Sequence, residues 1–169
     1  SGRVPWQYLE EVKWVHQLAK QNDLIGSMVA YFPVDQGESA QAELEELTAY
    51  PLIQGIRSMG NTEEQVASTQ YREGLRLLSE LDLSLDIHMG TADSDDYLTL
   101  IDQYPNLRFV LNHLGLPDVK NGELNAWKSG MQRLAKRPNV VCKLSGLLTR
   151  CHSEQIDSSF LRPYILTPL

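Results

Sequence analysis

The chain has 169 residues and a formal net charge of −7, with 42% hydrophobic and 22% charged residues. This length and composition fit one globular domain with a hydrophobic core. The acidic balance argues against nucleic-acid binding, because phosphate recognition needs a basic face. No apolar run reaches the roughly 20 residues of a membrane-spanning helix. The sequence therefore predicts neither a nucleic-acid nor a membrane partner.

Strand-like apolar runs alternate with helical stretches along the chain. The expected strands are Leu24–Tyr31, Ile53–Arg57, Leu83–His88, Arg108–His113 and Val140–Ser145. The expected helices are Pro5–Gln21, Glu38–Ala49, Thr62–Leu81, Asp93–Tyr104 and Glu123–Lys136, with a sixth beginning near Ser153. This alternation is typical of βαβ units around a parallel sheet. Because no low-complexity linker interrupts it, we expect a single domain over residues 1–169.

Polar residues gather on one side of the expected strands, since alternate residues of a strand share a face. They are Arg57, Asp86, His88, His113, Lys143 and Ser145. A doubly wound sheet is apolar on both faces, whereas a closed barrel accepts polar groups near its catalytic end. The pattern therefore favours a barrel.

Four motifs carry a resemblance to a known family. They are Gly55-Ile-Arg57, Leu85-Asp-Ile-His88, Val110-Leu-Asn-His-Leu-Gly-Leu-Pro117 and Val141-Cys-Lys-Leu-Ser-Gly146. Their order resembles that of the amidohydrolase superfamily, in its lactonase-type branch of sugar lactonases and 2-pyrone-4,6-dicarboxylate lactonases. The resemblance extends from about Leu24 to Tyr164.

The resemblance implies an α/β fold of the (β/α)8 TIM-barrel type. Family members carry His-x-His on the first strand and an aspartate on the last. This sequence has neither, since its histidines are His16, His88, His113 and His152. We therefore expect an incomplete barrel of about five parallel βα units, strands three to seven, that lacks the first two strands and the last one.

Three residues are candidates for catalysis. His113 stands where a strand meets a Gly/Pro turn, and the resemblance implies that it ligates a metal or holds the attacking water. A neutral imidazole suits either role. His88 is expected in the same position one strand earlier, as a second metal ligand or as a hydrogen-bonding wall residue. Arg57 could bind a substrate carboxylate or a developing oxyanion, or form a structural salt bridge with Asp86.

Other residues are expected in supporting roles. Ser145 and Lys143 are candidates for substrate binding, and Lys143 could alternatively form a buried ion pair with Asp86. His16 is expected to pack on a helix face, and His152 to lie in a loop. Three tryptophans, Trp6, Trp14 and Trp127, are expected to pack helices onto the barrel.

The resemblance implies a hydrolase that opens a small polar lactone, derived from a sugar or a dicarboxylic acid, by attack of an activated water. One divalent ion, zinc or manganese, is expected, although a metal-free mechanism stays open. Two alternatives also stay open. One is a metal-dependent decarboxylase of the same superfamily, and the other is a catalytically dead fragment or subunit.

The expected partners are a small-molecule substrate and either a second copy of the chain or the missing half of the barrel, because an open sheet exposes its edges. Cys142 and Cys151 match no metal or redox motif, and Cys142 is expected to be an inert core thiol. The chain starts at Ser1 without a recognisable secretory leader, so we expect a reducing, cytoplasmic location.

Overall fold

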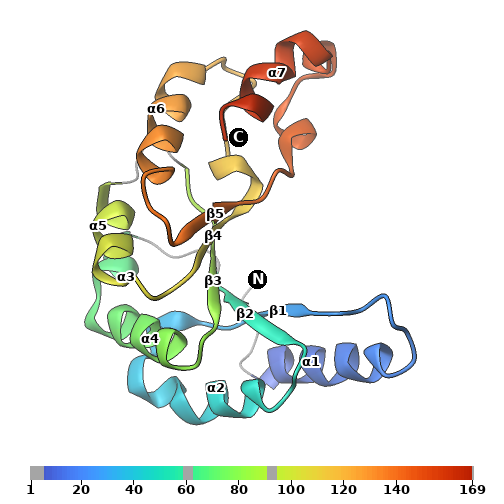
Figure 1. Cartoon of the computed structure of the whole chain (residues 1–169), viewed down its shortest axis with the longest axis vertical. Helices are drawn as coiled ribbons and strands as arrows, with labels where there is room; N and C mark the ends of the chain where they lie inside the picture. The colour runs from blue at the N-terminus through green and yellow to red at the C-terminus, as the bar shows by residue number, and fades with distance from the viewer. Residues whose placement is uncertain (1–5, 59–62, 91–94, 169) are drawn as a thin grey trace. The chain divides into compact units, whose positions relative to one another are not determined.

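A computed structural model describes residues 6–58, 63–90 and 95–168. The described strands form a five-stranded sheet in the order β1-β2-β3-β4-β5. The pairs β1 with β2, β2 with β3, and β4 with β5 are parallel. Figure 1 shows strands alternating with helices along the chain. The chain divides into two compact units, Ser1–Asp86 and Ile87–Leu169. Each unit is described by itself, and the single-domain organisation stays a prediction.

In its described residues, the first unit has the first part of the sheet and four α-helices. Its strands are β1 (Met28–Tyr31), β2 (Ile53–Arg57) and nearly all of β3 (Ser84–Ile87), and its helices are α1 (Trp6–Ala19), α2 (Gln41–Thr48), α3 (Glu63–Ala67) and α4 (Thr69–Glu80). The side chains of Phe32, Ile56, Tyr71, Leu75 and Leu85 are fully buried in this unit. Burying such apolar side chains provides the main driving force for its folding.

A serine divides the helix that the sequence predicts over residues 62–81. Ser68 has an extended backbone, and its hydroxyl accepts a hydrogen bond from the Tyr71 backbone N–H. A serine in this position satisfies one of the free N–H groups at a helix start. The prediction of one continuous helix was therefore wrong, and its first residue, Thr62, lies outside the described residues.

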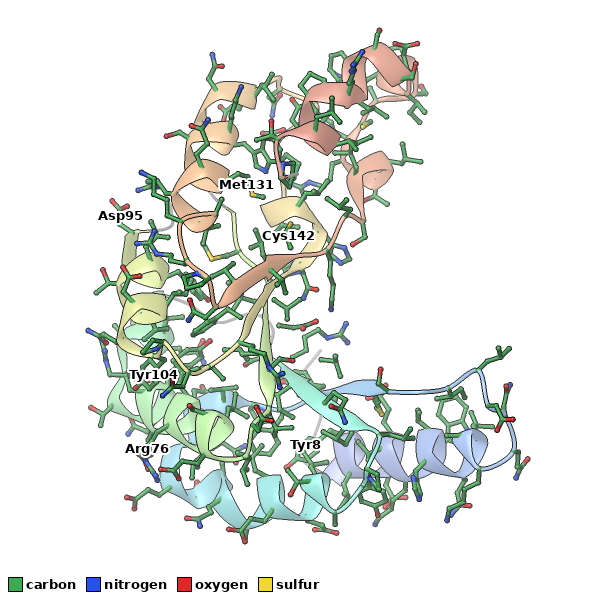
Figure 2. All side chains as sticks on the ribbon, viewed as in Figure 1. Tyr8, Arg76, Asp95, Tyr104, Met131 and Cys142 are labelled. Carbon is green, nitrogen blue, oxygen red and sulfur yellow. The ribbon has the colours of Figure 1, made fainter. Side chains whose placement is uncertain are left out.

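Two contacts fix the helices of the first unit. The Tyr8 hydroxyl of α1 donates a hydrogen bond to the Glu43 carboxylate of α2 (Tyr8 is labelled in Figure 2). Burial and the neighbouring carboxylate raise the pKa of Tyr8. Gly74 of α4 lies against the 3₁₀ segment Val34–Ala40, so closely that a Cβ at Gly74 would be 2.1 Å from the Val34 carbonyl oxygen.

The part of the second unit that the structure describes has the rest of the sheet and three α-helices. Its elements are α5 (Asp95–Gln103), β4 (Phe109–Leu111), α6 (Leu124–Leu134), β5 (Val140–Cys142) and α7 (Ser158–Leu166). The Asn139 side-chain amide, just before β5, donates to the Tyr104 and Leu107 carbonyls at 3.1 Å each. These bonds tie the end of α5 to the start of β5.

β2 has its predicted bounds, Ile53–Arg57, and the other four strands are shorter than predicted. The predicted strand Leu24–Tyr31 begins only at Met28, and Leu24 is 93% exposed. The predicted strand Arg108–His113 ends at Leu111, because the backbone turns left-handed at His113. Among the tryptophans, Trp127 is buried as predicted, whereas Trp14 is 64% exposed, which contradicts its predicted packing role. The side chain of Trp6 lies outside the described part of the structure.

We predict that Gly74→Ala destabilises the protein by about 1–3 kcal/mol, since overpacking against backbone carries such a cost. Helix propensity alone would make the alanine variant more stable by about 1 kcal/mol. A loss of stability therefore reports the close approach of Gly74 to Val34. Urea unfolding measures it. Gly26→Ala is the control, because a Cβ at Gly26 meets nothing within 4 Å. An equal or higher stability for Gly74→Ala would contradict the packing.

Candidate active site

His113 lies two residues after the carboxyl end of β4, in a short left-handed turn. Four consecutive residues have positive φ: His113 at 52°, Leu114 at 59°, Gly115 at 65° and Leu116 at 52°. Left-handed backbone costs about 1–2 kcal/mol for each non-glycine residue. Such strain persists only where the surroundings enforce it, and it is concentrated at functional sites.

Neighbouring elements hold this turn through its backbone. The Leu114 N–H donates to the Lys143 carbonyl at 3.1 Å, beyond the end of β5. The Leu114 carbonyl accepts a buried 2.6 Å hydrogen bond from Trp127 Nε1 of α6. The guanidinium of Arg150 donates through Nε to the Pro117 carbonyl at 3.3 Å, just after the turn. Helix α6 and the segment after β5 therefore offset the strain together.

The segment after β5 contacts the imidazole ring of His113. Its Nδ1 lies 2.8 Å from the Ser145 hydroxyl oxygen. Gly146 has a φ of +73°, and a Cβ there would lie 2.9 Å from both Cγ and Nδ1 of the ring. The glycine thus allows the backbone to approach the face of the imidazole. These contacts orient the ring and leave Nε2 for another partner.

His88 is the second histidine of this site. It follows the end of β3 directly, is exposed, and its ring centroid lies 5.7 Å from that of His113, with the two rings edge to face at 86°. The structure therefore brings together His88, His113 and Ser145, which the sequence predicts as site residues on three different strands. Their catalytic roles stay predictions.

Arg57 and Asp86 belong to the first unit, on paired strands. The two residues are register partners between β2 and β3. Asp86 is 2% exposed, and the Nε of Arg57 is buried without a hydrogen-bond partner among the described residues. A guanidinium with an unused N–H is able to donate a hydrogen bond to an anion. The predicted convergence of Arg57 with the two histidines stays a prediction.

Lys143 is exposed, whereas the predicted ion pair with Asp86 assumed a buried lysine. It contributes its backbone to the site, because its N–H donates to the Leu111 carbonyl at 2.9 Å and its carbonyl accepts from Leu114. Its substrate-binding role stays a prediction. Burial raises the pKa of the Cys142 thiol on β5, in agreement with an inert cysteine.

The two remaining histidines lie apart from these contacts. His16 of α1 packs edge to face on Tyr50 with centroids 5.2 Å apart, as its predicted packing role requires. His152 is exposed, in the segment between β5 and α7.

The described residues do not complete a metal site. Zinc in an enzyme takes three protein ligands and leaves one position for water. Within residues 6–58, 63–90 and 95–168, no group of three or more His, Cys, Asp or Glu side chains could hold an ion. His88 and His113 together supply two nitrogen ligands at most, so their role as metal ligands stays a prediction.

An apolar cavity of about 530 Å³ lies beside Ser145, between the segment after β5 and α7. It is lined by Leu114, Leu144, Ser145, Gly146, Leu147, Leu148, Thr149, Leu161 and Ile165.

In the described part of the chain, no helix is both long enough and apolar enough to cross a membrane.

Comparison with known proteins decides the family. The sequence profile of the amidohydrolase family matches residues 7–169. The chain belongs to the amidohydrolase family. This confirms the resemblance that its four motifs suggested.

Individual relatives point to the lactonase-type branch. An L-fucono-1,5-lactonase from Burkholderia ambifaria is 26% identical over 159 residues, which cover 92% of this chain and 54% of that protein. An amidohydrolase from Burkholderia multivorans with bound zinc has a TM-score of 0.76 at 23% identity, covering 92% of this chain and 56% of that one. A Pseudomonas putida protein described as a candidate 2-pyrone-4,6-dicarboxylic acid hydrolase has a TM-score of 0.71 at 21% identity, covering 92% of this chain and 56% of that one.

The structural likeness confirms the fold class, an α/β incomplete barrel of the (β/α)8 type. The chain spans little more than half the length of the curated relatives that it matches.

Trp127 and Arg150 were not predicted as parts of the site. The sequence offers no signal for their hydrogen bonds, since these depend on where α6 and the segment after β5 pack.

We predict that Gly146→Ala displaces the His113 ring and lowers stability by about 1–3 kcal/mol more than Gly122→Ala. Both glycines have a φ of +73°, so the left-handed backbone strains both variants equally. A Cβ at Gly122 meets nothing within 4 Å, whereas one at Gly146 meets the imidazole. Calorimetric unfolding of the two variants gives the difference. Equal destabilisation would show that the ring does not lie against Gly146.

Proposed function

We propose that the chain forms part of a hydrolase that opens a small polar lactone, derived from a sugar or a dicarboxylic acid. The observation that carries the proposal is the His113–Ser145 contact of 2.8 Å, at the carboxyl end of a barrel strand. Barrel enzymes build their active sites at this end of the strands. The lactonase name of one relative and the pyrone-dicarboxylic acid hydrolase description of another support the choice of a lactone.

In this proposal the Nδ1–H of neutral His113 donates to the Ser145 hydroxyl, which leaves Nε2 as the proton acceptor. A water molecule next to the lactone carbonyl gives one proton to Nε2 while the water oxygen bonds to the carbonyl carbon. The ring C–O bond then breaks, and His113 returns the proton to the leaving alkoxide. The product is the open hydroxy acid, and the imidazole regains its starting state.

The other predicted site residues have narrower roles. His88 packs edge to face against His113 and restricts the tilt of its ring. Arg57 is the candidate for a substrate carboxylate or the carbonyl oxyanion, because a guanidinium binds such oxygens in a fork. The resemblance also implies a final-strand aspartate and a divalent ion, zinc or manganese. No described residue replaces that aspartate, and the chemistry above uses only groups of this chain.

We expect His113→Asn in the full gene product to lower kcat by about 10²–10⁴-fold, the usual contribution of a general base. Asparagine tolerates a left-handed backbone, so the turn is retained. The assay follows acid release from L-fucono-1,5-lactone and from 2-pyrone-4,6-dicarboxylate. His152→Asn is the control, because His152 is exposed and outside the site. Unchanged turnover by His113→Asn would refute the proposal.

We expect Ser145→Ala to lower kcat about fivefold while leaving KM nearly unchanged. Loss of one neutral hydrogen bond costs about 1 kcal/mol, and the loss falls on ring orientation rather than on substrate binding. Steady-state kinetics on the same lactones separate the two constants. Ser39→Ala is a matched control, because the Ser39 hydroxyl belongs to the first unit and donates to the Gln36 carbonyl at 2.7 Å. A rise in KM alone would instead assign Ser145 to substrate binding.

A further inference from the structure

We infer that Trp127 is a positioning residue for His113, acting through the backbone of the left-handed turn. This inference rests on the proposed function. Trp127 lies on α6, 14 positions after His113, and is 3% exposed. Its indole Nε1–H donates to the Leu114 carbonyl, the residue immediately after His113, at 2.6 Å.

The carbonyl that Trp127 binds belongs to Leu114, a buried residue of the turn. Leu114 is 2% exposed and has a φ of 59°, so its carbonyl lies within a strained and buried turn. A buried carbonyl without a partner is costly, which means that the indole N–H favours the one backbone geometry that reaches it. The N–H of the same residue is bound to the Lys143 carbonyl at 3.1 Å. The backbone N–H and the carbonyl of Leu114 are thus both hydrogen-bonded. The peptide between His113 and Leu114 is held in place, and with it the direction of the His113 side chain.

The aromatic ring of Trp127 also packs on another ring, and this contact allows packing and hydrogen bonding to be tested separately. Its centroid lies 5.2 Å from that of Tyr164 on α7, with the planes tilted by 46°. A phenylalanine at position 127 retains an aromatic ring for this contact and lacks the N–H. Replacement by phenylalanine therefore removes the hydrogen bond while it keeps an aromatic ring at this position, and the Leu134→Ala control accounts for the buried surface that is lost.

The strain of the turn supplies a rescue experiment. Leu116 has a φ of 52°, and its N–H donates to the His113 carbonyl at 3.0 Å, which closes the turn. Glycine adopts positive φ without the Cβ penalty. Leu116→Gly therefore lowers the cost of the left-handed turn and reduces its need for the Trp127 bond. If Trp127 only packed α6, a glycine at position 116 could not compensate for its replacement.

The experiment compares Trp127→Phe, Leu116→Gly and the double variant in the full gene product. We expect Trp127→Phe to lower kcat about tenfold with KM unchanged, and the double variant to recover most of that loss. Backbone NMR shifts of residues 113–116 report the turn without reference to activity. In Trp127→Phe they should move away from left-handed values, and in the double variant they should return.

Leu134→Ala is the control for a general loss of stability. Leu134 lies on the same helix and is 2% exposed, so its truncation destabilises the packing of α6 without removing the indole bond. We expect this control to unfold at lower temperature than the parent protein while its kcat and the shifts of residues 113–116 stay unchanged.

The outcomes separate this inference from the proposed function. Unchanged shifts and unchanged kcat in Trp127→Phe would overturn the inference, and so would a loss that Leu116→Gly fails to rescue. If His113→Asn keeps full activity while the shifts respond to Trp127→Phe, the proposed function fails and the indole still fixes the turn. Movement of the shifts in Leu134→Ala would assign the effect to helix packing and overturn the positioning role.

Discussion

The left-handed turn at His113–Leu116 is the constraint on which the candidate site depends. Three non-glycine residues hold positive φ in it, so the turn cannot persist without outside support. Its support comes from the Lys143 carbonyl after β5, the indole of Trp127 on α6 and the guanidinium of Arg150. The same segment after β5 also provides Ser145 and Gly146 for the imidazole ring. Backbone strain and ring orientation thus share one set of supports.

This arrangement explains why small changes near the ring should have large effects. The face of His113 lies against a glycine, and its Nδ1 lies against a hydroxyl, so little room remains for a second ring orientation. Catalytic groups need positions fixed to within fractions of an ångström, and fixed neighbours supply that precision. The exposed position of His88 and the intermediate exposure of His113 leave the site accessible to a small molecule.

Strand periodicity predicted that His88, His113 and Ser145 lie close together, but it failed as a description of how His113 is oriented. The predicted face of His113 assumes a strand that continues as far as this residue, and β4 ends at Leu111. Beyond that point, the left-handed turn decides the direction of the ring. Similarly, the predicted burial of Lys143 assumed that the strand continues past Cys142, whereas β5 ends there and the lysine is exposed. The decarboxylase and the inactive-subunit alternatives stay untested.

The sequence by itself determined the order of strands and helices, the family and the residue types at the strand ends. These features depend on local periodicity, on Gly and Pro punctuation and on motifs that are close in the chain. Only the tertiary structure decided the partners of the site: Ser145 is 32 positions from His113, and Arg150 is 33 positions from Pro117. It also decided the indole bond of Trp127 to the Leu114 carbonyl. Such contacts depend on how separate elements pack, and the local sequence pattern carries no record of that packing.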